Sequence, residues 1–135
     1  MHTRSQEHAR IIHDRVSQML ALERTQQKRY GALCHRFPHI VRENGLAAAF
    51  GFLAAKGGAD QTSPEYSLLC HYAAVLGATD PSSLCRQTVD ASLAEYRWLT
   101  RRSLAAAEWF VRFAESVLKV DASGIGDEDV EASHA

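Results

Sequence analysis

An uncharged segment in the first half of the chain limits the possible folds more than any other feature. Between Leu46 and Ala55 the sequence has no charged residue and no hydroxyl group, and two glycines follow at 57 and 58. Apolar residues of 40–53 would cover most of the circumference of a helix, and such a helix is buried. The segment is far shorter than the ~20 residues that a membrane span needs. We therefore predict a central core helix and no membrane partner.

Helical spacing continues on both sides of this segment. Residues 4–33 carry apolar side chains at alternating three- and four-residue steps, which predicts one long helix. Glu23 and Gln26 interrupt its apolar stripe, so we expect the middle of that stripe to meet water or a polar partner. Pro38 suits a first helical turn, where its missing N–H costs nothing, so the core helix is predicted to run from Pro38 to the two glycines.

Capping signals predict the later helices. Ser63 precedes a proline and should begin a third helix that ends at Gly77, and Asp80 should cap a short fourth one. The last long helix is expected over about 89–120, with Trp98 among the residues that add bulk to its core side. No segment alternates with a period of two for long. The predicted fold is all-α, a compact bundle of about five helices with two long helices and the buried apolar one.

Length and charge suggest a single mildly basic domain. The chain has 135 residues, which fits one domain over 1–120, and the acidic, aperiodic residues 121–135 are expected to form a disordered tail. Residues 1–56 hold nine Lys or Arg and four Asp or Glu, whereas residues 57–135 hold six and twelve. Three cysteines without a CxxC pair and without a signal peptide predict a reduced, cytoplasmic protein. The basic half permits an anionic partner and equally fits a solvated helix face.

Motifs for catalysis or cofactor binding are missing from the sequence. The tightest group of metal-ligating residues is Cys34, His35 and His39, but adjacent ligands on a helix point in different directions and Pro38 interrupts the group. There is no GxSxG, HExxH, P-loop or GxGxxG motif. We expect no metal, no cofactor and no catalytic residue.

Basic residues are the remaining candidates for a functional surface. They gather at the corner after the first helix and on the last helix, and antiparallel packing of the long helices could join the two groups on one face. Tyr30 and Tyr96 are the candidates for stacking against bases, although both could be core-edge residues. The candidate phosphate contacts are Arg24, Lys28, Arg29, Arg36, Arg42, Lys56, Arg97, Arg101 and Arg102.

Three segments of the chain resemble one known family. Residues 4–16 read RSQEHARIIHDRV, residues 37–57 read FPHIVRENGLAAAFGFLAAKG, and residues 95–117 read EYRWLTRRSLAAAEWFVRFAESV. In order and spacing these segments are similar to the small helical subunit of the type III-B (Cmr) CRISPR effector complex. The loop 57–63, the cysteines and the acidic tail are not hallmarks of that family.

The resemblance implies a structural subunit of an antiviral ribonucleoprotein and no enzymatic activity. Expected partners are the other Cmr effector subunits, guide RNA, target RNA and neighbouring copies of the same chain. Two other classes stay open on the residues alone: a stand-alone helical protein–protein interaction or regulatory module, and a small helical nuclease or DNA-binding protein. The nuclease would need acidic metal ligands on one face, and none is evident in the sequence.

Overall fold

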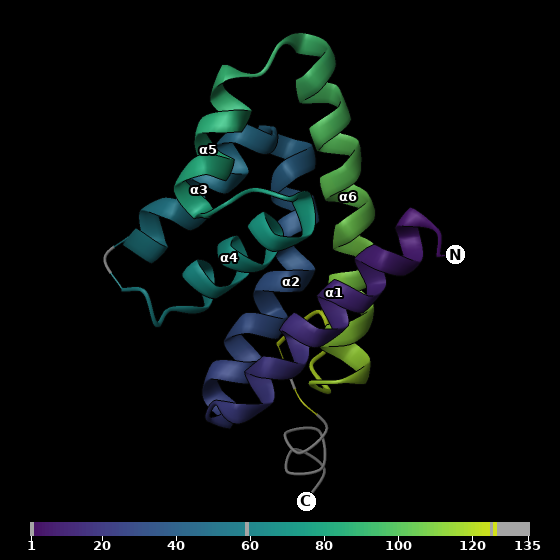
Figure 1. The fold of residues 1–135 in the computed structure, drawn as a ribbon. Coiled ribbons are helices and arrows are strands. Elements are labelled where there is room, and N and C mark those ends of the chain that lie inside the picture. Colours follow the sequence, from purple (N-terminus) through teal and green to yellow (C-terminus); the bar gives the residue numbers. More distant parts are fainter. Residues whose placement is uncertain (1, 59, 125, 127–135) are drawn as a thin grey trace, which may run out of the picture.

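The computed structural model describes residues 2–58, 60–124 and 126, and most of them are helical (Figure 1). Within these residues the protein is an all-α bundle of six α-helices and one 3₁₀ turn, with a single isolated β-bridge and no strand. No helix in the described ranges is long and apolar enough to cross a membrane. The elements are α1 (Arg4–Gln18), η1 (Met19–Ala21), α2 (Arg24–Asn44), α3 (Leu46–Gly58), α4 (Pro64–Leu76), α5 (Pro81–Asp90) and α6 (Leu93–Ser116).

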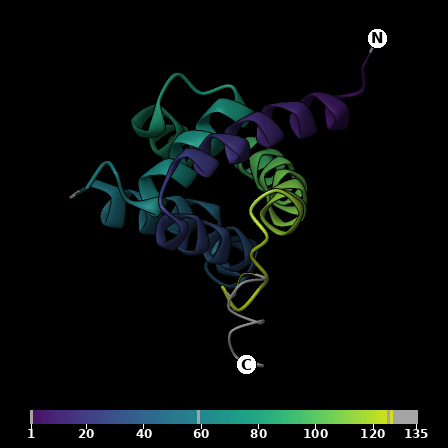
Figure 2. The ribbon, with the colours of Figure 1, turned by 90° about the horizontal axis from the view of Figure 1, so that it is seen from below.

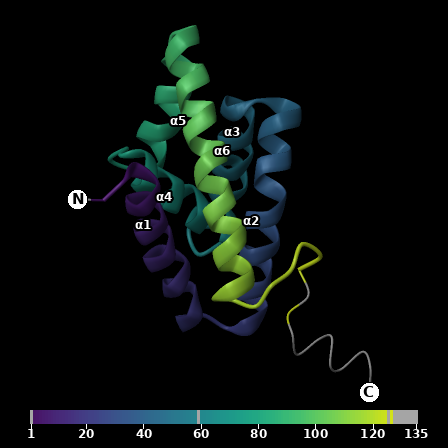
Figure 3. The same ribbon diagram turned by 90° about the vertical axis from the view of Figure 1, so that its right-hand side faces the viewer.

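The two longest helices, α2 and α6, pack side by side in opposite directions (Figure 3). At one end the Arg24 guanidinium donates hydrogen bonds to the Leu118 and Lys119 carbonyl oxygens. At the other end the Tyr96 hydroxyl accepts the Ala47 N–H at 3.0 Å, just beyond the end of α2. Figure 2 shows α6 nearly end-on, with α1 running across the view beside it.

The predicted single helix over 4–33 is wrong, because the chain breaks between α1 and α2. Leu22 is extended, and Glu23 takes the extended conformation of an N-cap residue. The Gln27 amide then donates to the carbonyls of Leu20 and Leu22, at 3.3 and 2.9 Å. The polar interruption of the apolar stripe therefore marks a corner, where a side chain satisfies carbonyls that a continuous helix would have paired.

The expected start of a helix at Pro38 is also wrong. Pro38 lies inside α2 and is buried, so the packing of this region outweighs the missing N–H. The break comes instead at Gly45, whose φ of 90° lies in a region that side chains rarely adopt. Asn44-Gly45 is a common turn pair and was the sequence signal for this break.

The last predicted helix is present but begins later and ends earlier than expected, after a break that separates it from α5. α5 ends at Asp90, and Ser92 caps α6 by accepting the Glu95 N–H at 3.2 Å. A serine two residues past the end of a short helix is an N-cap signal that the apolar periodicity of 89–120 concealed. The other capping predictions are confirmed, with Ser63 and Asp80 as N-caps and Gly77 as a left-handed C-cap.

An aromatic cluster forms the centre of the core. Tyr72 of α4 lies between Phe37 of α2 and Phe110 of α6, with ring centroids 4.7 and 4.5 Å apart, and Phe50 of α3 completes the cluster. The apolar segment forms α3, which buries Leu46, Ala49, Phe50 and Leu53. Its opposite face is exposed and consists mainly of small residues, so α3 packs mainly on α4 and α5.

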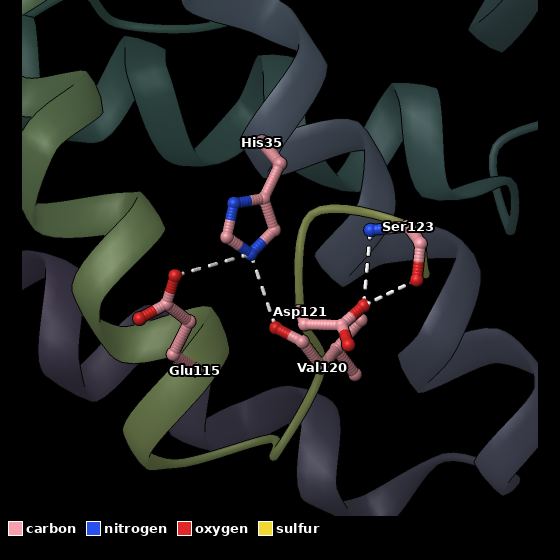
Figure 4. Close-up of polar contacts among 5 residues, drawn as sticks. All are labelled: His35, Glu115, Val120, Asp121 and Ser123. Atoms are coloured by element: carbon pink, nitrogen blue, oxygen red, sulfur yellow. Dashed lines mark hydrogen bonds and ion pairs between the residues drawn. The ribbon is translucent and has the colours of Figure 1, made fainter. Parts of the chain in front are cut away.

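Residues after α6 turn back along α2 (Figure 4). His35 Nε2 donates a hydrogen bond to the Val120 carbonyl at 3.0 Å and lies 3.9 Å from a Glu115 carboxylate oxygen. The Asp121 carboxylate accepts the backbone N–H and hydroxyl of Ser123, at 2.9 and 2.6 Å, and so closes a turn. The acidic tail predicted over 121–135 lies mostly outside the described residues.

Candidate functional site

Antiparallel packing separates Lys28 and Arg29, at the start of α2, from the basic residues of α6 to which it was expected to join them. Two contacts fix how residues of α2 and α6 correspond along the helix pair: Arg24 meets Leu118 at one end, and Gly45 lies near Tyr96 at the other. By interpolation, Arg101 lies beside about residue 40 of α2. Lys28 lies about 12 residues from that level, or roughly 18 Å along the helix. The basic residues at the start of α2 and those on α6 therefore lie toward opposite ends of the helix pair.

The exposed candidates lie in several places. Arg29 and Arg36 line a hollow of about 260 Å³ between α2 and the start of α4. Arg42 lines another, of about 360 Å³, where Arg112 faces it from α6. Lys56 and Arg97 are exposed on α3 and α6, and Lys28 is half-buried on α2.

Arg24 has a structural role in the described residues. Besides the carbonyls of Leu118 and Lys119, its guanidinium donates to the Gln27 side chain at 3.1 Å. These carbonyls follow the end of α6, where backbone acceptors lack helical partners. The guanidinium thus joins the start of α2 to the end of α6.

A groove between α1 and α6 brings cationic and aromatic side chains together, and we call it the α1–α6 groove. It has a volume of about 350 Å³ and combines three arginines with two tryptophans and one carboxylate. It is lined by Arg4, Ser5, His8, Trp98, Arg101, Arg102, Ala105, Glu108 and Trp109.

Arg102 lies at the centre of this groove. Its Nη2 atom is 2.9 Å from His8 Nε2, which accepts the hydrogen bond, and its guanidinium covers the Trp98 ring at 4.6 Å. Burial and then the nearby Arg4 charge lower the pKa of Arg102. Burial and then the charges of Arg102 and Arg4 lower the pKa of His8. The groove is therefore a place where positive charges repel one another.

No ion pair offsets this charge within the part of the chain that the structure describes, although the Glu7 charge acts against the lowering of the His8 pKa. None of Arg4, Arg101 and Arg102 has an Asp or Glu oxygen within ion-pair distance there, although Glu108 lines the same groove. Since like charges close together disfavour one another, an anion in the groove would relieve the repulsion.

The aromatic residues of the groove differ from those chosen on the sequence. Tyr30 is buried and bonds His71, so its ring is not accessible to a base, whereas half-buried Tyr96 uses its hydroxyl to cap the start of α3. Trp98, predicted as core bulk, keeps 40% of its surface exposed. Arg4 and Trp109 of this groove, and Arg112 of the hollow beside Arg42, were also absent from the candidates chosen on the sequence. The only sequence signal was the spacing of Trp98 and Arg102, one helical turn apart.

The residues considered for a metal point in different directions. Cys34 is buried in the core, and burial raises the pKa of its thiol. His35 bonds the Val120 carbonyl, and His39 pairs with Glu43 at 3.1 Å on the surface. Across residues 2–58, 60–124 and 126, no three His, Cys, Asp or Glu side chains form a group that could hold a metal.

A family model described as CRISPR-associated protein (Cas_Cmr5) matches residues 4–117. The chain belongs to this family. The match runs from the start of α1 to just past the end of α6, so it includes both sides of the α1–α6 groove. The resemblance to the small subunit of the Cmr system is therefore confirmed.

Two similar proteins support the assignment to the Cas_Cmr5 family. A protein of Thermus thermophilus named CRISPR system Cmr subunit Cmr5 is 35% identical over 119 residues, which cover 88% of this chain and 99% of that protein. A crystal structure of a CRISPR-associated Cmr5 family protein, also from Thermus thermophilus, has a TM-score of 0.74 and 33% identity. That comparison covers 85% of this chain and 97% of the other, so most of the bundle is shared.

Proposed function

We propose that this protein is a non-catalytic structural subunit of an RNA-guided type III-B (Cmr) CRISPR ribonucleoprotein in the cytoplasm. It packs against the other Cmr subunits and neighbouring copies of itself, and it helps to hold guide and target RNA in antiviral defence. The observation that carries this proposal is the Cas_Cmr5 family match over residues 4–117, together with a relative named as a Cmr subunit.

Exposed arginines and lysines would supply the RNA contacts. Double-stranded RNA is recognised mainly through its shape, phosphates and 2′-hydroxyls, so scattered cations suffice and no ordered pocket is needed. Guide pairing supplies sequence specificity in RNA-guided systems. The candidates for these contacts lie on three helices. On α2 and α3 they are Lys28, Arg29, Arg36, Arg42 and Lys56, and on α6 they are Arg97, Arg101 and Arg102.

Affinity capture from native cells tests membership of the complex. A tagged chain should copurify with guide-RNA-binding backbone subunits and with guide RNA. A variant ending at residue 120 should copurify equally well, because the helices form the proposed domain and the acidic tail lies beyond it. Capture of an unrelated partner without RNA would favour the alternative of a stand-alone helical interaction or regulatory module. RNA or DNA cleavage with magnesium, abolished by one substitution, would contradict a non-catalytic role.

Two charge-removal variants test the RNA contacts, one at each end of the α2–α6 pair. Lys28→Gln with Arg29→Gln removes the group on α2, and Arg97→Gln with Arg101→Gln removes the group on α6. Each lost phosphate contact should reduce the slope of log affinity against log salt by about 0.7 to 0.9 for the assembled complex. Arg86→Gln, exposed on α5, is the matched control. Unchanged slopes in both double variants would exclude these residues while leaving the family membership intact.

A further inference from the structure

The α1–α6 groove carries an excess of positive charge, with three arginines against the single carboxylate of Glu108 among its lining residues. Arg4 and Arg101 are exposed, and neither has a carboxylate partner among the described residues. Arg102, between them, is engaged by His8 and Trp98 and cannot move away from its neighbours freely. An anion that entered the groove would offset the repulsion among these three arginines.

The same groove presents an aromatic ring to solvent. Arg102 covers Trp98 from one side, and the ring still keeps 40% of its surface exposed. Trp109 is less available, because Phe113 stacks on it at 5.6 Å and Arg112 lies 5.0 Å from its centroid. Trp98 is therefore the more exposed of the two indole rings, and it lines the same groove as Arg4 and Arg101.

We propose that the α1–α6 groove binds an unpaired RNA nucleotide, whose base stacks on Trp98 and whose phosphates contact Arg4 and Arg101. This inference rests on the proposed function, which brings RNA to the protein, and it names the form of RNA that the groove takes. Aromatic rings and cations side by side are the elements by which proteins hold single-stranded nucleic acid without reading its sequence. A volume of about 350 Å³ lies within the range of small-molecule sites.

A duplex fits these features less well than an unpaired nucleotide. Bases inside a duplex are stacked on one another, so they cannot cover Trp98, and only the phosphates would use the groove. An acidic protein segment would pair with the arginines but would gain little from an exposed indole ring. Neither a duplex nor an acidic protein segment would therefore make use of the exposed Trp98 ring in the groove.

The experiment uses the purified full-length chain and a fluorescently labelled single-stranded tetraadenylate as the probe. Stacking on an aromatic side chain contributes about 1–3 kcal/mol per base, so Trp98→Leu should weaken binding about 5- to 150-fold, whereas Trp98→Phe should restore most of it. Arg4→Gln and Arg101→Gln should each reduce the salt slope by about 0.7. Arg86→Gln is the control and should leave affinity and slope unchanged. In a Trp109→Phe background, the remaining Trp98 fluorescence should be quenched as RNA is added.

Several results would overturn the proposal. The first is that Trp98→Leu binds the tetranucleotide as tightly as the parent chain does, and the second is that no binding is seen up to millimolar concentration. The third is that a duplex binds more tightly than the single strand. The fourth is that a hexaglutamate peptide displaces the RNA and binds the Trp98→Leu chain equally well. Copurification with Cmr subunits distinguishes a failure of the groove assignment from a failure of the proposed function. If the Trp98→Leu chain still assembles but RNA affinity never changes, only the groove assignment fails. If the parent chain does not assemble, the proposed function fails.

Discussion

The Tyr30 hydroxyl lies 2.7 Å from Nδ1 of His71 inside the core, where the pair joins α2 to α4. Both side chains are buried, and burial lowers the pKa of His71 to about 4, with a smaller contribution from the nearby positive charge of Arg15. Burial also raises the pKa of Tyr30, so both groups are neutral at neutral pH. The hydrogen bond between them satisfies two polar groups that would otherwise be unpaired in an aromatic core.

This buried histidine should make the protein sensitive to acid. The pKa of His71 is lower in the folded chain than its ordinary 6.5, so the unfolded chain binds the proton more readily between about pH 6.5 and 4. Stability should therefore fall as the pH is lowered through this window, by ~3 kcal/mol at most. Urea unfolding at pH 7.5, 6.0 and 5.0 measures the effect.

His71→Asn provides the control for the acid response. Asparagine keeps an acceptor near the position of Nδ1 and cannot titrate, so its stability should change less between pH 7.5 and 5.0 than that of the parent chain. Parallel pH curves for the two chains would show that another group is responsible.

Two glycines on α3 should respond oppositely to alanine. A Cβ at Gly57 would lie 2.9 Å from Cα and Cβ of Tyr66, so α3 and α4 would have to separate, at a cost of about 1–3 kcal/mol. A Cβ at Gly51 would meet nothing within 4 Å, and alanine there should stabilise the helix by about 0.5–1 kcal/mol. Thermal unfolding of the two variants measures both effects, and a loss of stability in Gly51→Ala would contradict the packing described for α3.

Tyr96→Phe should destabilise the junction of α2, α3 and α6. The hydroxyl accepts the Ala47 N–H, one of the donors that the start of α3 leaves without a helical partner. Its loss should cost about 1 kcal/mol in chemical unfolding. Thr100→Val is the comparison, because the Thr100 hydroxyl bonds the Tyr96 carbonyl of its own helix, at 2.8 Å. Equal effects of the two substitutions would argue against a capping role for Tyr96.

Arg24→Gln should lower stability in the absence of RNA. The arginine side chain holds the carbonyls of Leu118 and Lys119, and losing these charge-assisted bonds should cost about 1–2 kcal/mol. Arg29→Gln, exposed on the same helix, should stay within about 0.5 kcal/mol of the parent chain. If Arg24→Gln unfolds like the parent chain and affects only RNA retention, Arg24 is a phosphate contact, as its charge first suggested.

Local signals predicted the helical class and several helix ends, because each acts within one turn of the chain. Ser63 and Asp80 cap helices through bonds to residues three positions ahead, at 3.2 and 2.8 Å, and Gly77 ends α4 with its own backbone. The predicted helix ends are wrong where the apolar periodicity continues past such a local signal. Apolar spacing resumes in the same register beyond Glu23 and Gly45, although the backbone turns at both.

The amino-acid sequence alone determined that the chain is helical, where most of its caps lie, and which family it belongs to, since these depend on neighbouring residues and on ordered motifs. Only the tertiary structure decided that Arg24 joins two helix ends and that Arg4, from the first helix, lies in one groove with Trp98 and Arg101 from the last. The physical reason is that helix formation depends on nearby residues, whereas a site between helices depends on how distant segments pack.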